Sequence, residues 1–224
     1  MDVEFQNGPA FTVAVLRLAP GEQVRAEGGA MLSMTAGTQI ETSTQGGIFK
    51  GLKRSLSGES FFMNTFSAPS SGGELVLAPS LPGDMSLIDQ PGDTWLYHRD
   101  GFVACETGID LDTKWGGLKG AFGASSFFVV KCTGRGKVIF ATYGALRRVD
   151  LQAGQQYTVD SGHLVAWHEN MPIQVQKVGG LKSLLFSGEG FVVTLTGPGT
   201  FFTQTRSEAA FVSWLVPYLP KNNN

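Results

Sequence analysis

The sequence predicts an all-β, sandwich-like fold that is built from three internal repeats. A Gly-Leu-Lys triplet begins at Gly51, Gly117 and Gly180, and these positions lie 66 and 63 residues apart (51 to 117 and 117 to 180). Each triplet precedes an apolar segment typical of a buried strand, which begins at Phe61, Phe127 or Phe191. No long segment of helical periodicity interrupts this pattern.

Glycines recur in the same order around these strands. Each copy is expected to contain a tight turn, at Gly21, Gly92 or Gly154, and a glycine-rich hairpin, at residues 72–73, 134–136 or 197–199. The landmarks together predict repeats at residues 11–78, 84–142 and 148–205. Three copies suit a closed arrangement around a pseudo-threefold axis. No Pro- or Ser-rich linker separates the copies, so residues 1–224 are expected to form a single compact domain.

A short helix is expected at the C-terminal end, over residues 207–219. Ser207 is a suitable N-cap, and Glu208 would lie at the positive end of the helix dipole. Phe211, Trp214 and Tyr218 follow at helical spacing. We expect this aromatic face either to dock on the β core or to form an oligomer contact.

The charge of the chain argues against bulk electrostatic binding of nucleic acid. Lys plus Arg number 17 and Asp plus Glu number 19, for a net charge of −2, whereas nucleic-acid binding calls for a basic surface. Charged residues make up 16% of the chain, against about 25% in typical domains. This low share is consistent with surface that is buried against other subunits.

The cysteines and the chain's first residues indicate a cytoplasmic setting. Cys105 and Cys132 both lie in apolar, strand-like segments and are expected to be buried free thiols. The first residues are acidic and lack the apolar core of a signal peptide. No apolar segment reaches the roughly 18 residues that a membrane-spanning helix needs.

Motifs that carry chemistry are scarce, so we expect neither catalytic residues, nor metal ligands, nor a cofactor. His163 and His168 are five residues apart, which would place them on opposite faces of one strand, where they cannot share a metal. There is no Gly-x-Ser-x-Gly elbow. His98 could join Asp100 and Glu106 in an acid–base group, but the spacing does not require it.

The repeated loops carry the candidate binding residues. Lys53, Lys119 and Lys182 occupy equivalent positions, and Lys50 and Arg54 extend the first loop. If the repeats close around an axis, these cations would gather at one end and bind an anion, an anionic lipid head group or an acidic partner. The alternative is that the leucines of the loops fill the core and the lysines are solvated.

One stretch resembles a known protein family. Residues 46–62 (Gly-Gly-Ile-Phe-Lys-Gly-Leu-Lys-Arg-Ser-Leu-Ser-Gly-Glu-Ser-Phe-Phe), with Leu77-Ala78-Pro79, Pro82-Gly83-Asp84 and Gly116-Gly117-Leu118, are similar to bacterial and archaeal relatives of the fungal altered-inheritance-of-mitochondria (AIM) family. The resemblance implies a fold like that of the tryptophan RNA-binding attenuator protein (TRAP), a double-stranded β-helix class, and assembly into oligomers. The family has no agreed catalytic residues, and this chain lacks the mitochondrial targeting segment of its eukaryotic members.

Together these observations predict a non-enzymatic, oligomeric scaffold or binding protein, with a homotrimer favoured. Its Gly-Leu-Lys loops would engage an anionic membrane surface or a protein partner. One alternative is RNA binding, by analogy with the attenuator fold, although a shared fold is weak evidence for a shared function. A second alternative is a small-molecule-binding, cupin-like barrel, although the His-rich metal set of such barrels is missing.

Overall fold

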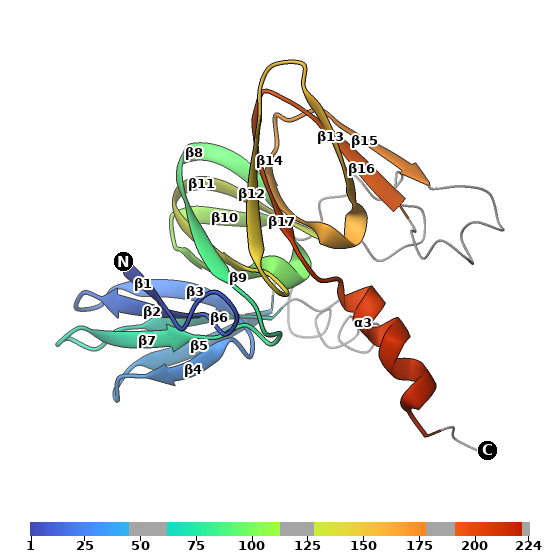
Figure 1. Cartoon of the computed structure of the whole chain (residues 1–224). Helices are drawn as coiled ribbons and strands as arrows, with labels where there is room; N and C mark the ends of the chain where they lie inside the picture. The colour runs from blue at the N-terminus through green and yellow to red at the C-terminus, as the bar shows by residue number, and fades with distance from the viewer. Residues whose placement is uncertain (45–61, 113–127, 178–190, 221–224) are drawn as a thin grey trace.

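The computed structural model describes residues 1–44, 62–112, 128–177 and 191–220. Apart from one α-helix and three short 3-10 turns, the regular structure in these ranges is β-strand (Figure 1). The strands are β1 (Asp2–Gln6), β2 (Val13–Leu18), β3 (Gln23–Glu27), β4 (Met31–Met34), β5 (Gln39–Thr44), β6 (Phe62–Ser67), β7 (Gly73–Leu77), β8 (Met85–His98), β9 (Phe102–Glu106), β10 (Ile109–Asp112), β11 (Val129–Ala141), β12 (Leu146–Leu151), β13 (Gln156–Asp160), β14 (Leu164–His168), β15 (Ile173–Lys177), β16 (Phe191–Thr196) and β17 (Gly199–Gln204). The predicted all-β class is confirmed.

The strands of the described ranges form three open sheets. The largest has the order β12-β17-β14-β8-β11-β9-β3-β6-β5, with β10 also paired to β11. The two smaller sheets have the orders β1-β2-β7-β4 and β13-β16-β15. The largest sheet therefore takes strands from all three predicted repeat ranges, and this pairing ties the ranges together.

The same antiparallel pairs occur within each range. In residues 11–78, β2 and β4 pair with β7, while β3 and β5 pair with β6. In residues 84–142, the first half of β8 and the strand β9 pair with the second half of β11. The second half of β8 and the strand β10 pair with the first half of β11. In residues 148–205, β12 and β14 pair with β17, while β13 and β15 pair with β16.

Two further strand pairs join one range to the next, and we call them the linking pairs. The first joins β3 to β9, with Arg25 opposite Cys105. The second joins β8 to β14, with Leu96 opposite Trp167. In both linking pairs the second strand follows a short 3-10 turn: β9 follows η1 (Arg99–Gly101), and β14 follows η2 (Ser161–His163).

Several turns expected from glycine are wrong. The predicted hairpins at residues 72–73 and 197–199 are turns between strands of different sheets, because β6 does not pair with β7 and β16 does not pair with β17. The chain continues through Gly92 within β8, and through residues 134–136 within β11, where a hairpin was predicted. Gly134 has a φ of +130°, and the register between β8 and β11 shifts next to it, between Thr133 and Arg135. Such a backbone lets a paired strand bend without ending. The glycines therefore mark a bulge in one continuous strand pair.

Buried apolar side chains form three clusters. The first lies in the N-terminal range and is built around Leu16, Phe66 and Leu75. The second centres on Tyr97, Phe102 and Phe140, and the third on Trp167, Val193 and Phe201. Cys105 and Cys132 are free and buried, as predicted. Burial raises the pKa of the Cys105 thiol to about 12, which keeps this thiol protonated and unreactive.

The predicted C-terminal helix is present as α3 (Glu208–Leu215), followed by the 3-10 turn η3 (Val216–Tyr218). The Ser207 hydroxyl accepts a hydrogen bond from the backbone N–H of Ala210, so it caps the helix. No residue of α3 is buried, and the expected docking of the aromatic face is restricted to an edge contact of Phe211 with Tyr143. Trp214 and Tyr218 are exposed. None of the helices within the described ranges is long and apolar enough to cross a membrane.

Tyr97 provides a test of the core packing. Its side chain is fully buried, and its hydroxyl has no hydrogen-bond partner among the described residues. An unsatisfied buried hydroxyl costs stability, so Tyr97→Phe is expected to raise the free energy of unfolding by up to about 1 kcal/mol. Chemical denaturation of both proteins measures the difference. Tyr157 is the matched control, because its hydroxyl accepts a hydrogen bond from Arg147 at 3.0 Å. Tyr157→Phe should leave stability unchanged or lower it slightly, and a clear loss of stability in Tyr97→Phe would contradict the prediction.

Candidate functional site

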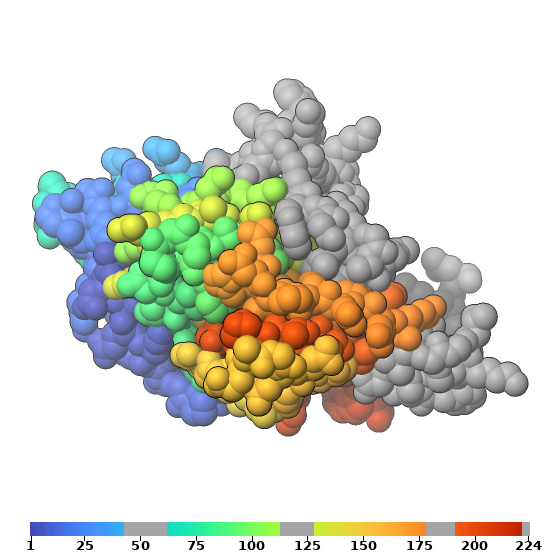
Figure 2. Space-filling model, turned by 90° about the horizontal axis from the view of Figure 1, so that it is seen from above, coloured from blue at the N-terminus to red at the C-terminus, as the bar shows by residue number. Residues whose placement is uncertain are grey.

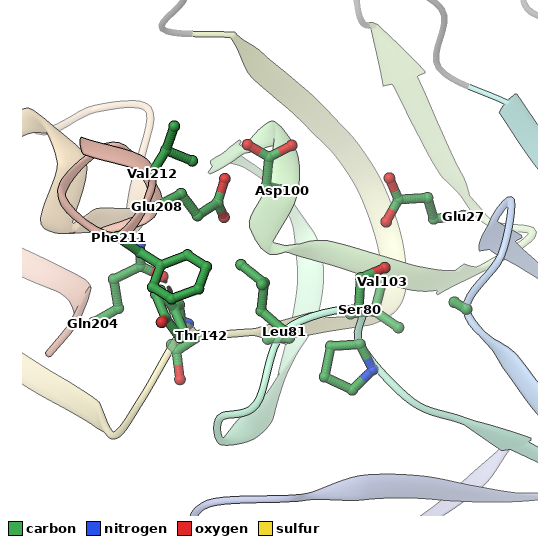
Figure 3. A pocket seen from close by; sticks show the side chains of 14 residues that line it. Glu27, Ser80, Leu81, Asp100, Val103, Thr142, Gln204, Glu208, Phe211 and Val212 are labelled. Atoms are coloured by element: carbon green, nitrogen blue, oxygen red, sulfur yellow. Dashed lines mark hydrogen bonds between the residues drawn. The ribbon is translucent and has the colours of Figure 1, made fainter. Parts of the chain in front are cut away.

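A cavity of about 370 Å³ lies between the strands and α3 (Figure 3). Its residues come from five separate parts of the sequence. These are the end of β3 and the turn after it, the connection between β7 and β8, the η1 turn with the start of β9, the end of β11 with the residues that follow it, and the end of β17 with the first turns of α3. The apolar part of its wall is formed by Ala30, Leu81, Val103, Ala141, Phe211 and Val212. Three carboxyl groups, those of Glu27, Asp100 and Glu208, line the same space.

The connection between β7 and β8 holds one wall in place through backbone hydrogen bonds. The Gly83 carbonyl accepts a hydrogen bond from Thr12 at 3.0 Å, and the Asp84 N–H donates to the Gly144 carbonyl at 3.0 Å. A side chain at Gly83 would overlap the carbonyl oxygen of Thr142, so only glycine permits this close approach. The position of Leu81 in the wall follows from these contacts.

The start of α3 forms the opposite wall. The chain leaves β17 after Gln204, whose side-chain oxygen accepts a hydrogen bond from the Tyr143 N–H at 2.9 Å. The ring of Phe211 stands edge-on to Tyr143, with ring centroids 6.1 Å apart. These contacts direct Glu208 and Phe211 toward the cavity, where Figure 3 shows them facing Asp100 and Leu81.

Burial and mutual repulsion change the ionisation of the carboxyl groups. Burial raises the pKa of Glu27 to about 7, and the negative charge of Asp100 adds to this effect. Burial likewise raises the pKa of Glu208 to about 7, helped by the charge of Asp100 and by a hydrogen bond with it. The positive charge of Arg99 partly offsets the rise at Glu27. At neutral pH Glu27 and Glu208 are therefore each partly ionised, and nearby positive charges do not fully balance the negative charge in the cavity.

Such a cavity is suited to a ligand that combines a positive charge with an apolar body. Ammonium and guanidinium groups donate strong hydrogen bonds to carboxylates, and a partly buried setting strengthens that attraction. The apolar wall would cover the rest of the ligand, as in most small-molecule sites. A carboxyl group with a pKa near 7 also exchanges its proton readily at neutral pH.

The residues predicted as binding groups lie outside the described ranges. These are Lys50, Lys53, Arg54, Lys119 and Lys182, together with the Gly-Leu-Lys loops that carry them. Their convergence on one face therefore remains a prediction.

The histidines of the described ranges do not form a common site. The nearest atoms of His98 and Asp100 are 3.7 Å apart, whereas Glu106 accepts a hydrogen bond from the backbone N–H of Lys137 at 2.8 Å. His168 contacts Asp93 at 3.2 Å, and His163 contacts the Gln204 carbonyl at 2.8 Å. Across the part of the chain that the structure describes, no group of three or more His, Cys, Asp or Glu side chains could hold a metal ion.

Sequence reasoning missed the carboxyl groups of the cavity as a set. Asp100 attracted attention only as a neighbour of His98, and Glu208 only as a helix-dipole residue. Glu27 carries no local signal, since it closes a short strand in an ordinary alternating pattern. The stretch around Pro79 and Pro82, which contributes to the resemblance with a known family, was the one hint, because residues between these prolines line the cavity.

Comparison with known proteins places this architecture among uncharacterised relatives. An uncharacterised protein of Streptococcus pyogenes serotype M6 is 26% identical over 223 residues, which cover 96% of this chain and 89% of that protein. The X-ray crystal structure of a Streptococcus pyogenes protein from a structural genomics programme superimposes with a TM-score of 0.81 and 23% identity, covering 97% of this chain and 99% of that one. This second likeness concerns the fold alone. The model of the family described as "Mitochondrial biogenesis AIM24" matches residues 3–206, and the chain therefore belongs to the AIM24 family.

Proposed function

We propose that this protein is a non-enzymatic binding protein, which holds a positively charged group of a ligand or partner in the cavity beside α3. The observation that carries the proposal is the placement of Glu27, Asp100 and Glu208 around one cavity with an apolar wall. Carboxylates that repel one another in a partly buried space gain stability when a cation enters. The binding of such a group offsets the cost of keeping these charges together.

The wider proposal keeps the expectations drawn from the sequence. It describes a homo-oligomeric scaffold in the cytoplasm, with a trimer favoured and with a TRAP-like arrangement of repeats. The three repeat ranges of one chain form open sheets, so in this proposal closure around an axis comes from several copies and not from one chain alone. The Gly-Leu-Lys loops would then supply a second, cationic surface for an anionic membrane or an acidic partner. RNA binding receives no support from the carboxylate-lined cavity, because a polyphosphate backbone is repelled by such a surface. A cupin-like metal site receives none from the described histidines, which lie in separate contacts.

The cavity is expected to bind an alkylammonium ion. Titration with n-hexylammonium, followed by NMR chemical shifts, should perturb residues around the cavity, whereas uncharged n-hexanol should bind more weakly. Glu27→Gln and Glu208→Gln should each weaken binding about tenfold, because a hydrogen bond to a charged group contributes about 1.5–3 kcal/mol. The matched control is Glu41→Gln, since Glu41 is exposed on β5 away from the cavity wall. Equal affinity for the two probes, or equal affinity in wild type and both cavity variants, would overturn the proposal.

Stability should depend on pH through Glu27. Its pKa in the folded protein is about 7, well above the usual glutamate value of 4.5, so the folded state binds more protons than the unfolded state between these two pH values. Stability contributed by this group is therefore lost as the pH rises from about 4.5 to 7. Glu27→Gln removes the ionisation, and it should raise the Tm relative to wild type at pH 8 but much less at pH 5. The Glu41→Gln protein serves as the reference, and a pH-independent difference for Glu27→Gln would contradict the assignment.

The lysine loops are tested separately by vesicle sedimentation. Wild-type protein should pellet with phosphatidylcholine vesicles that contain phosphatidylserine, and the triple variant Lys53→Glu, Lys119→Glu, Lys182→Glu should remain in the supernatant. Lys177→Glu, at the exposed end of β15, is the control for a change of net charge. If wild type also stays in the supernatant, the membrane part of the proposal is wrong, while the cavity part is unaffected.

A further inference from the structure

Several of the described strands have one edge without a partner, and β4 and β13 are two of them. β13 pairs with β16 alone, and β4 pairs with β7 alone. Their counterparts in the linking pairs have partners on both edges: β3 lies between β6 and β9, and β14 lies between β17 and β8. Figure 1 shows β4 at one end of the molecule and β13 at the other. In Figure 2 most of the blue N-terminal segment lies toward the left, and the orange segment extends toward the right.

The registers show that β4 is the equivalent, in the first range, of β9 and β14, which are the second strands of the two linking pairs. The three strands have equivalent partners. Met34 lies opposite Leu75 of β7, Cys105 opposite Val138 of β11, and Trp167 opposite Phe201 of β17. In all three strands the register then shifts, so that one residue is left out of the pairing. That residue is Leu32 in β4, Val103 in β9 and Val165 in β14.

The side chain left out of the pairing is exposed in β4 but buried in β9 and β14. Val103 and Val165 are 2% and 1% exposed, whereas Leu32 is 60% exposed. Met31 is also exposed, although its counterparts Phe102 and Leu164 are buried. The same apolar position is thus covered wherever a linking pair forms, and it is open to solvent in β4. An exposed, uncharged edge strand of this kind is a site for strand pairing.

The core clusters point the same way. The first cluster receives five buried side chains from the next range, and Val103, Ala104 and Ile139 are among them. The second cluster receives Val165, Ala166 and Phe202 from the range after it. The third cluster contains no such contribution, since its members come from its own range and from the range before it. The side chains at the corresponding positions in the first range are Leu32, Ser33 and Val76, and none of them belongs to any of the three clusters.

We propose that β4 of one copy pairs antiparallel with β13 of a second copy, in the register of the linking pairs. Thr158 of β13 is the counterpart of Arg25 in β3 and of Leu96 in β8. Thr158 lies opposite β16, Arg25 opposite β6 and Leu96 opposite β11, at equivalent positions. Met34 is the counterpart of Cys105 and Trp167. The new pair therefore places Thr158 opposite Met34 and Val159 opposite Ser33. Leu32 of one copy then covers the third cluster of the next.

A second copy of the chain is the partner that fits, because each chain carries one edge of each kind. The contact is head-to-tail, so it closes into a ring or extends into a filament according to the rotation between copies. This inference deepens the oligomeric part of the proposed function, and it does not depend on the cavity or on the lysine loops.

The first test uses the exposed leucine. Wild type is expected to be oligomeric in light scattering after size-exclusion chromatography, and Leu32→Asp should shift the mass to that of the monomer. Phe11→Asp is the matched control, because Phe11 is also largely exposed, at 72% against 60% for Leu32, and lies outside β4. Circular dichroism checks that the variants remain folded. A monomeric wild type, or an oligomer that Leu32→Asp leaves intact, would overturn the proposal.

The second test fixes the register by disulfide formation. Side chains directly opposite in an antiparallel pair lie close enough for a cysteine pair to be oxidised. Thr158→Cys protein mixed with Met34→Cys protein should give a crosslinked heterodimer under mild oxidation. Thr158→Cys mixed with Ile40→Cys, on the exposed face of β5, should not. The native Cys105 and Cys132 are buried and should not interfere. If the crosslink is absent, or equal in both mixtures, the proposed pair is wrong, whereas binding of n-hexylammonium tests the cavity independently.

Discussion

The antiparallel pairing of β8 with β11 is the interaction on which the other sheet contacts depend. The two strands are paired along almost their whole length. β8 also carries β14 on its free edge, and β11 carries β9 and β10. Since β9 pairs with β3 and β14 with β17, this central pair connects the N-terminal and C-terminal parts of the sheet. The bend beside Gly134 lets the pairing continue while the sheet changes direction.

The cavity is a consequence of this arrangement. Glu27 ends β3, and Asp100 lies in the turn that leads into β9, so the linking pair between β3 and β9 brings the two carboxyl groups to one region. The long strand β11 ends at Ala141, which forms part of the cavity wall together with the next residue, Thr142. The chain after β17 adds Glu208 from the opposite side. Repulsion in the cavity is tolerated because protonation removes part of the charge of Glu27 and Glu208, as the raised pKa values of these two groups indicate.

Local patterns were sufficient for some elements and insufficient for others. Runs of adjacent apolar residues identified β6, β16 and the first part of β11, and the capping signal at Ser207 identified α3. Glycine was ambiguous, because a residue that permits a tight turn also permits a bulge. Gly72 and Gly154 mark turns between strands, whereas Gly92 and Gly134 lie inside continuous strands. The difference depends on whether a partner strand continues on both sides, and no local sequence signal reports that.

The amino-acid sequence was enough to predict the all-β class, the C-terminal helix, the free buried thiols and the family to which the chain is similar. These properties depend on residues that are close together or on composition, because strand periodicity, helix capping and burial of cysteine are local or average effects. Which carboxyl groups share a cavity and which strand edges are left open depends on the folded arrangement of distant strands. Glu27, Asp100 and Glu208 are far apart in the sequence, and their proximity arises from strand pairing between ranges. The exposure of Leu32 has the same origin, since the equivalent residues Val103 and Val165 are buried where the neighbouring strand is present.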